Sequence, residues 1–168
     1  MNINLQMNSI SKTEKVLAIF QLLFSVAVFC ILTTTLCHYI VELEKMLGDN
    51  VSYLKLVKNY HFSFVVSLLA FVSAILILKQ NISGWLLGII SWLIYTLTFS
   101  IALFNTISKN QFENFYILFG FIALLIASIT FSIYLFIRLR KNHEPTLSHY
   151  KISGLILLLL LVDYWIIK

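Results

Sequence analysis

Charged residues are scarce in this sequence, where they make up 11% of 168 residues, against about 25% in a typical water-soluble domain. One proline and five glycines exclude a collagen-like repeat and a Pro/Gly-rich linker, and two cysteines are too few for a disulfide scaffold. Apolar residues, by contrast, make up 60% of the chain, and the charged residues gather in short clusters between long apolar runs. This composition predicts an integral membrane protein and excludes an aqueous domain of any size.

Five apolar runs are long enough to cross a hydrocarbon core of about 30 Å, which takes about 20 residues of helix. They cover residues 16–37, 62–78, 82–104, 115–137 and 152–167. The last run is short and contains Asp163, which costs about 3 kcal/mol at mid-membrane, but each Leu, Ile or Val returns about 0.3 to 0.6 kcal/mol. The sequence therefore predicts an all-α fold, a polytopic transmembrane helical bundle of about five spans that forms one membrane domain over residues 1–168.

The segment 38–61 carries apolar residues at helical spacing that are interrupted at Gly48-Asp49-Asn50. This pattern predicts an outer helical hairpin, in which the first helix continues to Leu47 and the second returns into the second span. Two short helices lying in the headgroup layer are the alternative. The connection Lys79-Gln80-Asn81 is so short that spans two and three must be antiparallel neighbours.

The first span reads as an uncleaved anchor, because its apolar core is longer than that of a cleavable signal. Ser11 followed by Glu14 three residues later predicts a capping box at its start. Lysine and arginine set the orientation of the spans. With a cytoplasmic N-terminus, seven of them lie on the inner side and five on the outer side, and Arg138, Arg140 and Lys141 open the basic inner loop 138–151. We therefore expect the N-terminus inside and the C-terminus outside.

Small residues line one face of two spans. Gly84, Gly88 and Ser91 lie on one face of span three, and Ser67 and Ala70 lie on one face of span two. Such faces let helix backbones approach closely, either within one subunit or between copies. We expect packing at these positions and a homo-oligomer. In span three, Trp85 is expected to anchor the helix at the membrane interface.

Asp163 is the candidate functional acid, because an ionisable group in an apolar run is by default an ion ligand, a proton carrier or the partner of a cation on another helix. The alternative is a carboxylate close enough to the end of its span to reach water. Cys30 and Cys37 are about 10.5 Å apart along one helix, too far for a mutual disulfide, and are expected to be buried, inert thiols. No spacing typical of a metal site, no cofactor motif and no catalytic signature is present, so we expect no metal, no cofactor and no enzymatic activity.

Two function classes fit these features. The first is a non-enzymatic membrane component that acts as sensor, anchor or immunity-type partner of another protein, in which Arg138, Arg140 and Lys141 bind a cytosolic protein or lipid headgroups. The second is a small oligomeric channel or transporter, which the absence of charge from spans one to four disfavours. The frequent Ile, Asn, Lys, Phe and Tyr have AT-rich codons, which favours a bacterial, horizontally acquired gene. Because such genes often serve phage defence or toxin immunity, we expect by association a role in antiviral defence at the bacterial cytoplasmic (inner) membrane. Nucleic acid is not an expected direct partner.

Overall fold

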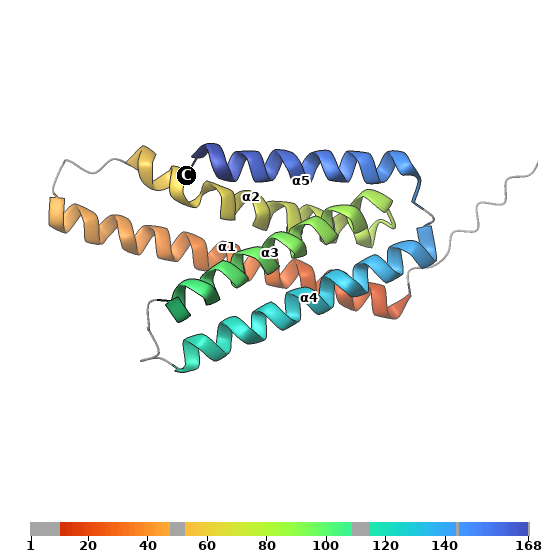
Figure 1. Ribbon diagram of the computed structural model, residues 1–168, viewed down its shortest axis with the longest axis horizontal. Helices are drawn as coiled ribbons and strands as arrows, with labels where there is room; N and C mark the ends of the chain where they lie inside the picture. The colour runs from red at the N-terminus through yellow and green to blue at the C-terminus, as the bar shows by residue number, and fades with distance from the viewer. Residues whose placement is uncertain (1–10, 48–52, 109–114, 144, 168) are drawn as a thin grey trace, which may run out of the picture.

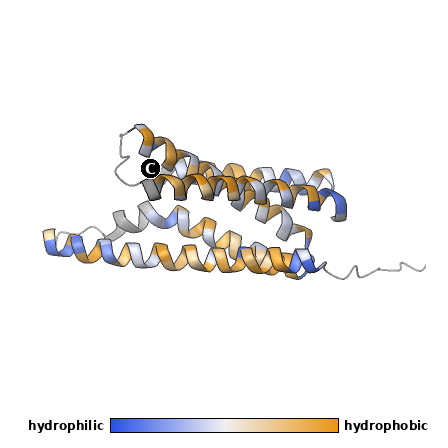
Figure 2. Cartoon of the chain, turned by 90° about the horizontal axis from the view of Figure 1, so that it is seen from below, coloured by the Kyte–Doolittle hydropathy of each residue, from blue (hydrophilic) through white to orange (hydrophobic). Residues whose placement is uncertain are grey.

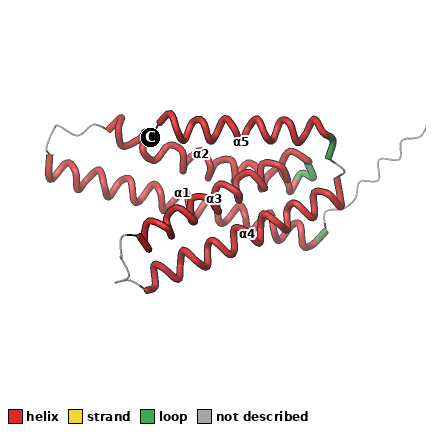
Figure 3. The backbone as a smooth tube through the Cα atoms, in the orientation of Figure 1, coloured by secondary structure: helices red, strands yellow, loops and turns green. Residues whose placement is uncertain are grey.

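The computed structural model describes residues 11–47, 53–108, 115–143 and 145–167, which are helical almost throughout and contain no strand (Figure 1, Figure 3). The helices are α1 (Lys12–Leu47), α2 (Tyr53–Leu78), α3 (Ile82–Ser108), α4 (Phe115–His143) and α5 (Leu147–Ile167). All five are long and apolar enough to span a membrane. The predicted all-α membrane bundle of about five spans is confirmed.

Helix α1 is longer than a membrane span requires. Its 36 residues extend about 54 Å, whereas the hydrocarbon core is about 30 Å thick. It runs without interruption to Leu47, and α2 begins at Tyr53 and continues directly into its apolar part, as the hairpin interpretation predicts. The predicted turn at 48–50 lies outside the described residues. Figure 2 shows hydrophilic residues at the helix ends and hydrophobic residues between them.

The start of α1 has the predicted capping box. The backbone N–H of Ser11 donates to Glu14 Oε2 at 3.1 Å, and the N–H of Glu14 donates to Ser11 Oγ at 3.3 Å. These two bonds satisfy N–H groups that the first turn of a helix leaves without an intrahelical acceptor. Glu14 is thereby held at the helix N-terminus, where a negative charge is favourable.

A tight turn makes α2 and α3 antiparallel neighbours, as predicted. The N–H of Gln80 donates to the carbonyl of Ile77 and the N–H of Asn81 to that of Leu76, both at 2.9 Å, the pattern of a Schellman motif. Gln80 has φ 58°, the left-handed conformation that favours glycine. Asn81 then caps α3, because its Oδ1 accepts from the N–H of Ser83 at 2.9 Å.

Replacing Gln80 with glycine should stabilise the turn. A non-glycine residue in the left-handed region costs about 1 to 2 kcal/mol, so Gln80→Gly is expected to raise the free energy of unfolding by about 1 kcal/mol. Thermal unfolding in detergent, followed by tryptophan fluorescence, measures this gain. Asn81→Gly is the matched control, because it removes a cap in the same turn and should lower the unfolding midpoint. A lower midpoint for Gln80→Gly would contradict the expectation.

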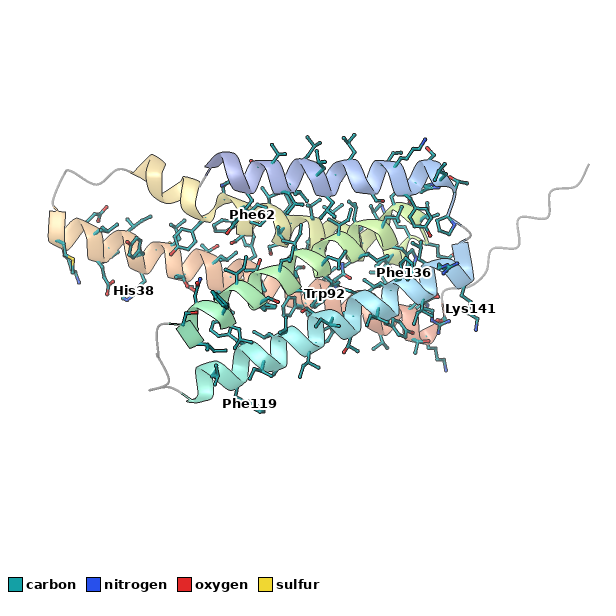
Figure 4. The ribbon with its side chains drawn as sticks, viewed as in Figure 1. His38, Phe62, Trp92, Phe119, Phe136 and Lys141 are labelled. Carbon is teal, nitrogen blue, oxygen red and sulfur yellow. The ribbon has the colours of Figure 1, made fainter. Side chains whose placement is uncertain are left out.

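Helix α3 lies at the centre of the bundle. It packs between α2 and α4, α1 packs against α2 and reaches Trp92 of α3, and α5 lies against α2 and α3 (Figure 1). Trp92 of α3, labelled in Figure 4, is 2% exposed and stacks on Phe24 of α1 and Phe131 of α4, with ring centroids 5.0 and 4.6 Å away. This aromatic cluster joins α1 and α4 to the central helix.

Two expectations about side-chain environment are wrong. Trp85 is 1% exposed and belongs to the core of the bundle, so it is not an anchor at the membrane interface. Cys30 and Cys37 are exposed on α1 and not buried, although both are free thiols, as expected. In both cases the prediction of burial or exposure was based on the residue type. The actual burial depends on which face of α1 or α3 packs against the neighbouring helices.

Candidate functional site

The small residues of α3 allow two close approaches. A Cβ atom built on Gly84 would lie 2.6 Å from the backbone N of Ile77 and 2.7 Å from the carbonyl carbon of Leu76, so only glycine fits against α2 there. A Cβ on Gly88 would lie 2.8 Å from Ser73 Oγ on α2 and 3.2 Å from Leu135 on α4. These glycines therefore contact other helices of the same chain.

The other predicted packing residues are also buried inside the subunit. Ser91 is 0% exposed and donates to the carbonyl of Leu87 in its own helix. Ser67 and Ala70 are 1% and 0% exposed, and the structure places them against α1: Ser67 Oγ donates to the carbonyl of Ser25 at 2.9 Å. The small face of α2 thus meets α1, while α3 meets the neighbouring face of α2.

A buried glutamine connects three helices at this level. Gln21 of α1 is 0% exposed, and its Nε2 donates to the carbonyl of Ala70 at 2.9 Å and to Ser73 Oγ at 2.8 Å. Its Oε1 accepts from the indole N–H of Trp92 at 3.3 Å. Ser73 Oγ in turn donates to the carbonyl of Gly84 at 2.7 Å. The amide is fully engaged, which suits it for fixing α1, α2 and α3 in register rather than for binding a ligand.

One end of the bundle is strongly basic. The start of α1, the α2–α3 turn, the end of α4 and the start of α5 lie together there (Figure 1). We call this surface the basic end; its described residues include seven lysines and arginines, namely Lys12, Lys15, Lys79, Arg138, Arg140, Lys141 and Lys151. All are exposed except Arg138, which is half-buried, and Figure 4 shows Lys141 at the tip of α4.

Arg138 is held by the protein itself. Its Nε donates to the hydroxyl of Tyr134 at 3.1 Å, its Nη2 donates to Thr13 Oγ1 of α1 at 3.4 Å, and its guanidinium lies 5.7 Å from the centre of the Tyr134 ring. Arg140 lies 5.9 Å from the ring of Phe136 and is exposed, as is Lys141. Of the three predicted binding residues, Arg138 therefore joins α4 to α1, whereas Arg140 and Lys141 face outward.

Acidic residues do not balance this charge. Among the described residues of the basic end, Glu14 is the one carboxylate, and it is 8% exposed and engaged in the cap of α1. Among the described residues, the opposite end carries equal numbers of basic and acidic residues, namely Lys45, Lys55 and Lys58, and Glu42, Glu44 and Asp163. The basic end is thus a one-sided positive field, which attracts anionic groups.

Asp163 meets a partner that the sequence did not reveal. Its Oδ2 lies 2.8 Å from His61 Nε2 of α2, and the side chains of His61 and Asp163 are 24% and 37% exposed. Directly beside them, the rings of Phe62 and Tyr164 are 5.1 Å apart. The structure therefore pairs Asp163 with an ionisable side chain on another helix, one that is positively charged only when it is protonated. The signal in the sequence is topological: antiparallel spans two and five place residues 61 and 163 at the same end.

Among the described residues, no group of three or more His, Cys, Asp or Glu side chains is close enough to hold a metal ion. The described residues present two electrostatic features, a one-sided basic surface and a histidine–carboxylate pair at the other end of the bundle. No known protein family matches the chain, and neither the curated proteins nor the solved structures contain one that is similar to it.

Proposed function

We propose that this protein is a non-enzymatic membrane component that holds a partner protein at its basic end, as a sensor, anchor or immunity-type partner. The observation that carries the proposal is the one-sided charge: six of the seven basic residues are exposed, and the one described carboxylate there is buried in a helix cap. Charge of one sign over the ends of four helices favours a partner with an acidic surface.

The same charge supports an orientation. Positive residues next to membrane spans are retained on the cytoplasmic side, so the basic end is proposed to face the cytoplasm and the partner to be cytosolic. The N-terminus is then inside and the C-terminus outside, and a bacterial inner membrane and a role in defence complete the proposal. The packed rings around Trp92 leave a channel less favoured, because a path would have to form between copies of the chain.

Charge reversal at the basic end tests this function. Arg140→Glu with Lys141→Glu should reduce recovery of the partner at least tenfold when the tagged protein is purified in mild detergent and analysed by mass spectrometry. These residues are exposed, so the fold should not suffer. Lys45→Glu with Lys58→Glu makes the same charge change at the opposite end and should recover the partner as wild type does. Equal recovery in all variants, or a homo-oligomer without a partner, would overturn the proposal and favour the channel.

A further inference from the structure

Helix α5 is the least embedded helix of the bundle. Most of its large apolar residues are well exposed, for example Leu155 at 58% and Leu159 at 57%, and Leu160 alone among its described residues is buried, at 8%. It contacts α2 and α3, and among the described residues its backbone does not come close to α1 or α4 (Figure 1). A helix packed on one side over so little surface can change its position without disrupting the core.

The polar attachment of α5 to the bundle lies near its C-terminus. There, Asp163 bonds to His61 of α2 at 2.8 Å, and Tyr164 packs on Phe62. Both residues of the pair are partly exposed, and they lie at the ends of the candidate spans Tyr60–Leu78 and Leu147–Tyr164. Histidine changes its charge between about pH 5 and 8, so the pair is an ion pair in mildly acidic solution and a weaker neutral–anionic hydrogen bond at higher pH.

The described helices around this pair carry the following titratable groups. α3 contributes no charged residue, and its one tyrosine, Tyr95, packs in the Trp92 cluster. On α1 the titratable side chains at this end, Cys37, His38, Tyr39, Glu42, Glu44 and Lys45, include the mutual pair of His38 with Glu42. Tyr60, Lys55 and Lys58 precede His61 on α2, and Tyr164 follows Asp163 on α5.

The N-terminal part of α5 lies at the basic end of the bundle. Thr146 caps the helix through His149, with Thr146 Oγ1 2.7 Å from His149 Nδ1, and Lys151 lies in the next turn. The connection from Lys141 on α4 to Leu147 is only a few residues long. α5 is a continuous helix of 21 residues, about 31 Å long, and so connects Asp163 to the basic end as one element.

We propose that the His61–Asp163 pair is a proton-sensitive latch that holds α5 against α2 and, from the opposite end of the bundle, regulates partner docking at the basic end. The docking part rests on the proposed function. The sign follows from the charges: the latch is tightest when His61 is protonated and Asp163 ionised. It loosens when the pH rises and His61 loses its proton.

A distance measurement tests the latch without any partner. Spin labels at Lys151→Cys and Lys79→Cys, in a Cys30→Ser, Cys37→Ser background, report the distance between the start of α5 and the α2–α3 turn in lipid nanodiscs. We expect the mean distance to change by about 5 Å, one helical turn, between pH 5.5 and 8.5. Asp163→Asn should give the pH 8.5 distribution at both pH values, and the exchange of His61→Asp with Asp163→His should restore the change.

Glu42→Gln is the matched control, because it disrupts a second histidine–carboxylate pair, 3.2 Å apart and within α1, and should leave the distance change intact. A wild-type distance that does not respond to pH, or an equal response in Asp163→Asn, overturns the latch while partner docking at the basic end stands. Conversely, a latch that responds in a protein without a partner at Arg140 and Lys141 overturns the proposed function alone. If the latch and the partner docking are both observed, the amount of partner recovered should differ at least threefold between pH 5.5 and pH 8.5. Equal recovery at the two pH values overturns the regulatory link.

Discussion

Gly84→Ala should lower the free energy of unfolding by about 3 kcal/mol, the upper range for an overpacked site. The added methyl group would lie 2.6 to 2.7 Å from the backbone of Leu76 and Ile77, and backbone atoms at a tight turn cannot move aside as a flexible side chain does. The helices α2 and α3 must therefore separate along their contact. For a chain of this length, such a loss corresponds to a fall of roughly 10 °C in the unfolding midpoint.

The chain supplies its own control for this substitution. Gly154 of α5 is also a helical glycine, but a Cβ built on it meets nothing within 4 Å. Gly154→Ala should leave the midpoint unchanged or raise the unfolding free energy by up to about 1 kcal/mol, because alanine favours helix over glycine. Thermal unfolding of both variants in one detergent gives the comparison. Similar midpoints for the two would show that the close approach of α3 to α2 does not exist.

Gln21→Leu should cost about 3 kcal/mol although it makes α1 more apolar. The leucine fills a similar volume but removes three hydrogen bonds, from Nε2 to Ala70 and Ser73 and from Trp92 to Oε1. A bond between membrane helices is worth about 0.6 to 2 kcal/mol, and the buried indole N–H of Trp92 loses its acceptor at a further cost. Loss of that bond should also shift the tryptophan emission.

Ser25→Ala is the control for Gln21, one turn further along α1. Ser25 is 1% exposed, but its hydroxyl donates to the carbonyl of Leu22 in the same helix, and its carbonyl, which accepts from Ser67, remains in the variant. We expect a change of less than about 1 kcal/mol. If Gln21→Leu unfolds at the same temperature as Ser25→Ala, the amide does not hold the three helices together.

Hydropathy sufficed to predict the spans, because each is a local property of about 20 residues. The capping box at Ser11 and the short turn at Gln80 are equally local, and both were correctly predicted. The burial of Trp85 was not correctly predicted, because an aromatic residue near a helix end fits a membrane interface and a protein core equally well. Its burial follows from the rotation of α3, which the contact of Gly84 with α2 fixes.

The contacts of Gln21 and of the His61–Asp163 pair lay beyond sequence reasoning for a related cause. Gln21 stands 49, 52 and 71 residues before its three partners, and His61 stands 102 residues before Asp163. Neither contact has a sequence motif, since a glutamine in an apolar run and a histidine at the edge of another are compatible with many arrangements. Asp163 was singled out because a lone charge in an apolar run is conspicuous. Identifying His61 as its partner required knowledge of how the five helices are arranged.

The hydrogen bonds of Gln21 also dictate an order of events during biosynthesis. A ribosome adds about 5 to 20 residues per second, so Gln21 is made about 4 to 14 seconds before Trp92, 71 residues later. Until then the Oε1 atom of Gln21 lacks the indole N–H of Trp92, whereas α2 already supplies both acceptors of its Nε2 group. The bonds of Gln21 can therefore form once the first three helices are made, whereas the core is completed later, when Phe131 and Leu135 of α4 and Leu160 of α5 are added.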